Sequence, residues 1–155
     1  MITYMKYFIT LFSVLVFNSL LAQDNYNLKQ GFIAEGYDVV AYFSNEATKG
    51  EDNFVSEHNH VNYKFSTAKN LKIFNSNPEK YVPQYGGYCA YAVAVKGEKI
   101  GVNPKTFQII DDKLYLFYNK WGVNTLENWN DEGVEKLQVQ ANENWKKIVK
   151  KEFSF

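Results

Sequence analysis

The chain contains a single cysteine, Cys89. One thiol cannot form an intramolecular disulfide, so the fold must be stabilised by a hydrophobic core and not by cross-links. The high aromatic content supplies large apolar side chains for such a core. The thiol itself is then a small buried hydrophobe, a soft metal ligand, a reactive group or an intermolecular link.

The N-terminal residues have the order of a secretory signal peptide. Lys6 precedes an apolar stretch at residues 7–17, and a short segment after it ends at Ala22. The apolar stretch is shorter than the roughly 20 residues of a spanning helix, which favours a cleaved signal over an uncleaved membrane anchor. We therefore predict a signal peptide at residues 1–22, a periplasmic or secreted protein, and no membrane span in the mature chain.

The charges argue against nucleic acid as a partner. The formal net charge is zero, and all 17 basic residues are lysines. Without arginine, the chain lacks the bidentate contacts that read guanine edges and phosphates. The chain also has no excess of basic residues that would attract a nucleic-acid backbone.

Alternation of apolar and polar residues predicts several short strands. Residues 54–57 and 61–65 have a strand pattern on either side of a polar link, and residues 107–110 and 114–118 form a second hairpin pattern. Residues 38–43 are apolar and β-prone and are also expected to be a strand. Polar stretches at residues 44–53 and 97–105 are typical of loops.

Helical periodicity dominates elsewhere. Residues 68–75 fit a helix of about two turns behind an N-cap at Ser66 or Thr67, and alanines favour a helix over a strand at residues 88–95. Apolar residues from Val134 to Val149 follow i, i+3, i+4 spacing over about four turns. Hairpins and helices without βαβ alternation predict one small α+β domain with a long C-terminal helix.

Several segments together resemble the YHS-domain family. They are residues 36–43, 63–70, 74–81 and 109–116, with the densest match at residues 83–94 around Tyr-Gly-Gly-Tyr-Cys. A final stretch at residues 141–145 is similar to the exported subgroup. We therefore predict three parts: the signal peptide at residues 1–22, a polar leader at residues 23–35, and a domain at residues 36–150 that the resemblance implies to be of the YHS type.

The resemblance also implies an association with metals, but with a difference at the site. Metal-associated relatives, such as the modules of copper-transporting ATPases, have cysteines where this chain has Ala41, Ser66 and, at about the third position, Asn70. Neither alanine nor serine can replace a thiolate on a soft metal. The usual metal site of the family therefore cannot be transferred to this chain.

Other residues offer a different candidate metal site. Cys89 is one possible ligand, and His58 and His60 lie two apart, so that an extended strand would place both imidazoles on one face. Together the three side chains could bind copper, or alternatively zinc. The alternative is that Cys89 packs in the core and the histidines are solvated turn residues.

Two further features have open interpretations. The tyrosines Tyr81, Tyr85, Tyr88 and Tyr91 either line an aromatic pocket for a small ligand or belong to the core. Asp38 is either a catalytic carboxylate or a cap for local backbone near Gly36.

The sequence favours a non-catalytic protein. We find no nucleophile elbow and no glycine-rich phosphate loop, and nothing in the spacing specifically supports a Cys–His dyad. The predicted function is therefore binding of a transition metal, copper first. The alternative is a structural or interaction domain of the cell envelope without a metal.

Overall fold

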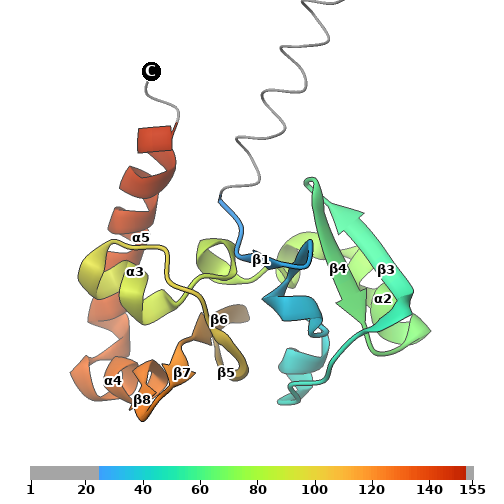
Figure 1. Cartoon of the computed structure of the whole chain (residues 1–155), viewed down its shortest axis with the longest axis horizontal. Helices are drawn as coiled ribbons and strands as arrows, with labels where there is room; N and C mark the ends of the chain where they lie inside the picture. The colour runs from blue at the N-terminus through green and yellow to red at the C-terminus, as the bar shows by residue number, and fades with distance from the viewer. Residues whose placement is uncertain (1–24, 153–155) are drawn as a thin grey trace, which may run out of the picture.

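The computed structural model describes residues 25–152, so the predicted signal peptide at residues 1–22 lies outside the described part. Within it, the chain forms a mixed α+β domain, as the sequence predicts. In Figure 1 the β3–β4 hairpin and helix α2 lie on one side of the domain, and helices α3, α4 and α5 lie on the other side. The β5–β6 hairpin lies between these two groups. Among residues 25–152, no helix combines the length and the apolar character needed to cross a bilayer.

The larger sheet has four strands in the order β1-β2-β4-β3. Its strands are β1 (Leu28–Lys29), β2 (Phe32–Ile33), β3 (Glu51–His58) and β4 (Val61–Phe65). β3 and β4 form the predicted antiparallel hairpin, whereas β2 pairs in parallel with β4. The segment that we predicted as a leader therefore contributes two strands to the domain, and Ile33 beside it is fully buried.

Helix α2 (Ala68–Ser76) follows this sheet and confirms the predicted helix. The Thr67 side chain caps it by accepting a hydrogen bond from the Asn70 N–H, which satisfies one of the unpaired amides of the first turn. Two short 3-10 turns, η3 (Pro78–Lys80) and η4 (Gln84–Gly87), then lead to α3 (Ala90–Lys96).

The second half of the domain contains two hairpins and two helices. Its elements are β5 (Asn103–Ile110), β6 (Lys113–Phe117), β7 (Asn119–Lys120), β8 (Val123–Asn124), α4 (Thr125–Glu132) and α5 (Val134–Glu152). The turn between β5 and β6 has positive φ at Asp111 and Asp112, the conformation of tight hairpin turns. The predicted hairpin and the predicted long helix are both confirmed.

Two hydrophobic clusters of buried residues stabilise the two halves. The first lies between the four-stranded sheet, α2 and β6, and includes Phe65, Phe74 and Cys89. The second lies between α3, β6, α4 and α5, and includes Trp129 and Leu137. β6 contributes side chains to both clusters, which makes it the central element of the fold.

The predicted strand at residues 38–43 is wrong. The structure forms η1 (Ala34–Gly36) and then η2 (Ala41–Ser44), a 3-10 helix. The Asp38 carboxylate accepts hydrogen bonds from the Val40 and Ala41 N–H groups, which turns the backbone away from an extended course. This local capping role is one of the two interpretations that the sequence left open for Asp38.

Candidate functional site

Cys89 lies in the core between η4 and α3. Its side chain is 0% exposed. The Sγ atom accepts a hydrogen bond from the Tyr118 N–H (3.4 Å) and lies 3.3 Å from Thr125 Oγ1. The Cys89 N–H donates to the Ile100 carbonyl (2.9 Å), which joins the start of α3 to the loop before β5. These contacts are those of a structural residue that joins three segments of the core.

The two histidines lie at the tip of the β3–β4 hairpin. His58 Nε2 is 2.7 Å from Glu79 Oε1, and His60 Nδ1 is 3.8 Å from Glu57 Oε1. Asn59 and His60 both have positive φ, so a tight turn replaces the extended strand that would have placed the imidazoles on one face. Each imidazole therefore has its own carboxylate partner.

The candidate ligands do not form a metal site in this arrangement. The hydrogen-bond partners of Cys89 Sγ are Thr125 and Tyr118, not the histidines. Among residues 25–152, no group of three or more His, Cys, Asp or Glu side chains could hold a metal ion. A thiolate bound to copper or zinc needs nitrogen or sulfur neighbours within bonding distance, whereas the neighbours of Sγ here are a hydroxyl and a backbone amide. The residues present therefore do not fit copper or zinc at Cys89.

The residues Ala41, Ser66 and Asn70 meet around the carboxylate of Asp38. Asp38 Oδ2 accepts hydrogen bonds from Ser66 N (2.8 Å), Ser66 Oγ (2.7 Å) and Asn70 Nδ2 (2.8 Å). Asp38 Oδ1 accepts from Val40 N (2.9 Å) and Ala41 N (3.2 Å). Asp38 is fully buried, and five donors surround it. This place in the fold is therefore a hydrogen-bonded structural cluster of hard oxygen and nitrogen groups, which does not suit a soft metal.

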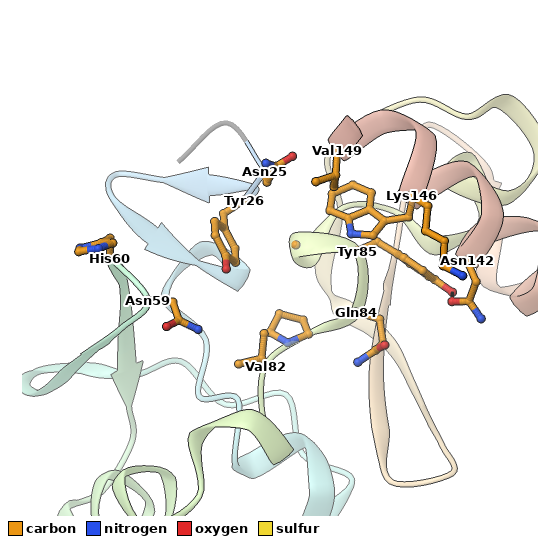
Figure 2. A pocket seen from close by; sticks show the side chains of 13 residues that line it. Asn25, Tyr26, Asn59, His60, Val82, Gln84, Tyr85, Asn142, Lys146 and Val149 are labelled. Carbon is orange, nitrogen blue, oxygen red and sulfur yellow. Dashed lines mark hydrogen bonds between the residues drawn. The ribbon is translucent and has the colours of Figure 1, made fainter. Parts of the chain in front are cut away.

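A cleft of about 770 Å³ between the β3–β4 hairpin tip, the segment before β1, η4 and α5 is a candidate site. Figure 2 shows these four segments facing the same opening. The cleft is lined by Asn25, Tyr26, Asn59, His60, Val82, Pro83, Gln84, Tyr85, Gly86, Asn142, Trp145, Lys146 and Val149. Its volume lies within the range of about 300–1,000 Å³ that is typical of ligand pockets.

Gly86 positions the N-terminal wall of the cleft. Its φ is +59°, and an added Cβ would lie 1.8 Å from the carbonyl oxygen of Asn25. This close approach lets the Asn27 N–H donate to the Gly86 carbonyl (2.8 Å) and the Asn27 side chain donate to the Gly87 carbonyl (3.1 Å). The motif Gly86-Gly87 therefore fixes the segment before β1 against η4 because glycine alone leaves space for it.

Helix α5 supplies the opposite wall. The Trp145 ring lies 6.1 Å from the Tyr85 ring, at 63° to it, and 6.2 Å from the Tyr88 ring. The Tyr85 hydroxyl donates to Asn142 Oδ1 (3.0 Å), and burial raises the pKa of Tyr85. Tyr85 also has a positive φ of 53°, a conformation that costs energy for a residue with a Cβ and that is concentrated at functional sites.

The lining of the cleft is more apolar than polar, and its polar groups are mainly amides. Four amides, those of Asn25, Asn59, Gln84 and Asn142, lie among its described lining residues, and these residues include no carboxylate. Lys146 is the formal cation of the lining. The Asn25 Oδ1 atom is buried and has no hydrogen-bond partner.

The sequence indicated this cleft only in part. Two tyrosines of the predicted cluster belong to the site: Tyr85 lines the cleft, and Tyr88 packs against Trp145. The other two lie elsewhere: Tyr81 packs against Phe43, and the Tyr91 hydroxyl donates to Glu132 (2.5 Å). Trp145 and the residues next to it on α5 were not predicted as site residues, because the apolar spacing of the helix accounted for Trp145 as core. The unusually amide-rich lining is the signal that could have indicated them.

A comparison of the chain with protein-family models, with curated proteins and with solved structures found no match.

Proposed function

We propose that this protein is an exported, non-catalytic binding domain of the YHS type, and that its ligand binds in the cleft between the hairpin tip and α5. The observation that carries the proposal is the cleft itself, a preformed opening of about 770 Å³ with aromatic rings and convergent amides. A preformed concave site with a few oriented polar groups is the usual form of a small-molecule site. The export and family parts of the proposal are supported by the sequence resemblance and by the signal-peptide pattern at residues 1–22.

The geometry favours this function over transition-metal binding through Cys89. The sulfur is buried, and its neighbours are Thr125 and Tyr118 instead of the two histidines. The same neighbours argue against a Cys–His dyad, since a catalytic thiol needs a base within hydrogen-bond reach.

The test is to map where small molecules bind. Amide and indole NMR signals of the ¹⁵N-labelled protein are recorded while a library of polar and aromatic fragments is added. We expect binding fragments to shift the Trp145 indole N–H signal and the Gly86 amide signal. The Trp129 indole, fully buried in the second hydrophobic cluster, should stay unchanged.

A matched pair of variants provides the control. Asn142→Phe fills the cleft and should abolish the shifts, whereas Glu143→Phe changes an exposed neighbour on α5 that does not line the cleft and should preserve them. Shifts that map to another surface, or that survive Asn142→Phe unchanged, would overturn the proposed site.

A further inference from the structure

We infer that the ligand of the cleft is an acidic oligosaccharide, that is, a chain of sugar rings that carry carboxylate groups. This inference rests on the proposed function and names its ligand class. Three properties of the lining support it: oriented aromatic faces, a high density of amides, and positive charge without a carboxylate.

The aromatic rings offer flat apolar surfaces beside the amides of the cleft. Trp145 is half-buried and is held by an edge contact with Tyr85 and a tilted contact with Tyr88, so its orientation is fixed before a ligand arrives. Tyr26 lies on the opposite wall, as Figure 2 shows. A pyranose ring has apolar C–H faces that pack on such rings, whereas its hydroxyl groups remain at the edge.

The amides match the hydroxyl groups of a sugar. Each of Asn25, Asn59, Gln84 and Asn142 carries one acceptor oxygen and two N–H donors, and a hydroxyl both donates and accepts. Asn142 is oriented by the Tyr85 hydroxyl, which donates to its oxygen. The Asn59 amide nitrogen already lies within hydrogen-bond distance of His58 and Glu79, and Asn25 Oδ1 is buried, so Gln84 and Asn142 are the amides most open to a ligand hydroxyl.

The charge of the lining favours an anion over a neutral or cationic ligand. Lys146 lies on the α5 wall and His60 lies at the hairpin tip, and no carboxylate is among the described lining residues. At the hairpin tip, Glu57 lies 3.8 Å from His60 Nδ1 and Glu79 Oε1 lies 3.5 Å from Asn59 Nδ2. The positive charge is therefore confined to the α5 wall, where Lys146 is the cationic group. Because Lys146 is exposed, its contribution is modest and should change affinity only a few-fold.

The extent of the cleft favours several rings over one. Its lining residues come from four segments, from the hairpin tip at Asn59 to Val149 on α5, and its volume is in the upper part of the range for ligand pockets. A single monosaccharide would contact only part of this lining. A short oligomer would contact both walls at once.

The experiment is calorimetric titration of the purified protein with tetragalacturonic acid, an acidic probe, and with cellotetraose, a neutral probe of equal length. We expect tetragalacturonic acid to bind and cellotetraose to bind at least about three-fold more weakly. Lys146→Gln should weaken binding of the acidic probe by about two- to five-fold, since exposed ion pairs contribute little. Lys147→Gln, which removes an adjacent exposed lysine outside the cleft, should leave affinity unchanged.

Stacking is tested at the same site. Trp145→Phe should keep the packing against Tyr85 and should weaken both probes, whereas Trp121→Phe alters an exposed tryptophan that does not line the cleft and should have no effect.

The outcomes separate this inference from the proposed function. If neither saccharide binds but another fragment class shifts the Trp145 indole, the saccharide inference is wrong and the binding function stands. Equal affinities of the two probes, or equal effects of Lys146→Gln and Lys147→Gln, overturn the acidic character of the ligand. If no compound of any class shifts the cleft signals, the proposed function itself fails.

Discussion

Replacing Asp38 should destabilise the protein more than any other single carboxylate change in the described chain. Five hydrogen bonds converge on its carboxylate, from three donors at Oδ2 and two at Oδ1. Asp38 is 0% exposed, so water cannot reach its position in the folded state. The Asp38→Ala change removes every acceptor and leaves the donors.

The cost follows from how well each donor can find another partner. Val40 N–H is buried and loses this acceptor, which costs about 1–3 kcal/mol. Ala41 N–H keeps a 3.2 Å bond to the Asp38 backbone carbonyl. The donors of Ser66 and Asn70 are half-buried and partly regain water, at a cost of roughly 0.5–1.5 kcal/mol each. Summed over the Val40 donor and the three donors of Ser66 and Asn70, the total is roughly 2.5–7.5 kcal/mol, a large fraction of the roughly 5–15 kcal/mol of a typical domain.

The assay is urea unfolding monitored by tryptophan fluorescence and by far-UV circular dichroism. Asp38→Asn should cost about 2–4 kcal/mol, because it keeps one acceptor oxygen but places an NH₂ group opposite donors. Asp52→Asn is the control: Asp52 is exposed and pairs with Lys64, so the change should leave the urea midpoint almost unchanged. If Asp38→Ala lowers the free energy of unfolding by less than about 1 kcal/mol, the structural role that we assign to this cluster is wrong.

Three further predictions concern other parts of the fold. Cys89 is buried, so it should resist thiol-specific reagents in the native protein and react only on unfolding; rapid labelling of the native protein would contradict its structural role. The purified protein and the Cys89→Ala variant should also contain equal amounts of copper and zinc, and a loss of metal in the variant would contradict the same role. Gly86→Ala should lower the free energy of urea unfolding by at least about 2 kcal/mol, because Gly86 has a positive φ and the new Cβ would lie 1.8 Å from a carbonyl oxygen. Gly101→Ala is the control: no atom lies within 4 Å of its new Cβ, so the change should be nearly neutral. Burial raises the pKa of Tyr42 and Tyr63 above the ordinary value of 10.0, so their contribution to stability is constant below pH 10 and stability should fall as the pH rises above it; a urea midpoint equal at pH 8 and pH 11 would refute this.

The sequence predicted the elements whose signals are local. Helix α2 has an N-cap at Thr67 and apolar spacing within nine residues, and the β5–β6 hairpin has two β-rich runs around Asp111 and Asp112. These signals do not depend on the rest of the fold, which is why the predicted elements and the α+β class are confirmed.

Elements that depend on distant partners were not predictable in this way. Residues 38–43 have β propensity, but the Asp38 side chain captures two backbone N–H groups and also bonds Ser66, 28 residues away. Similarly, β1 and β2 have two residues each; β1 pairs with β2, and β2 joins the sheet by pairing with β4, so a polar segment was predicted as a leader. Tertiary contacts decide the conformation in both cases.

The cleft has the same limitation. Its walls come from residues near Asn25, Asn59, Tyr85 and Trp145, and the helical period of α5 cannot show that Trp145 meets a hairpin tip. The Cys89 and histidine positions illustrate the reverse case, in which residue chemistry suggested a site that the fold does not assemble.

The docking of the N-terminal segment on Gly86 and Gly87 also sets an order of events during synthesis. The bond between the Asn27 side chain and the Gly87 carbonyl spans 60 positions of the chain. A ribosome delivers Asn27 long before this partner arrives. The side chain of Asn27 must therefore wait without this acceptor until more than half of the polypeptide has been made, and this interval is when chaperones would have most access to the segment before β1.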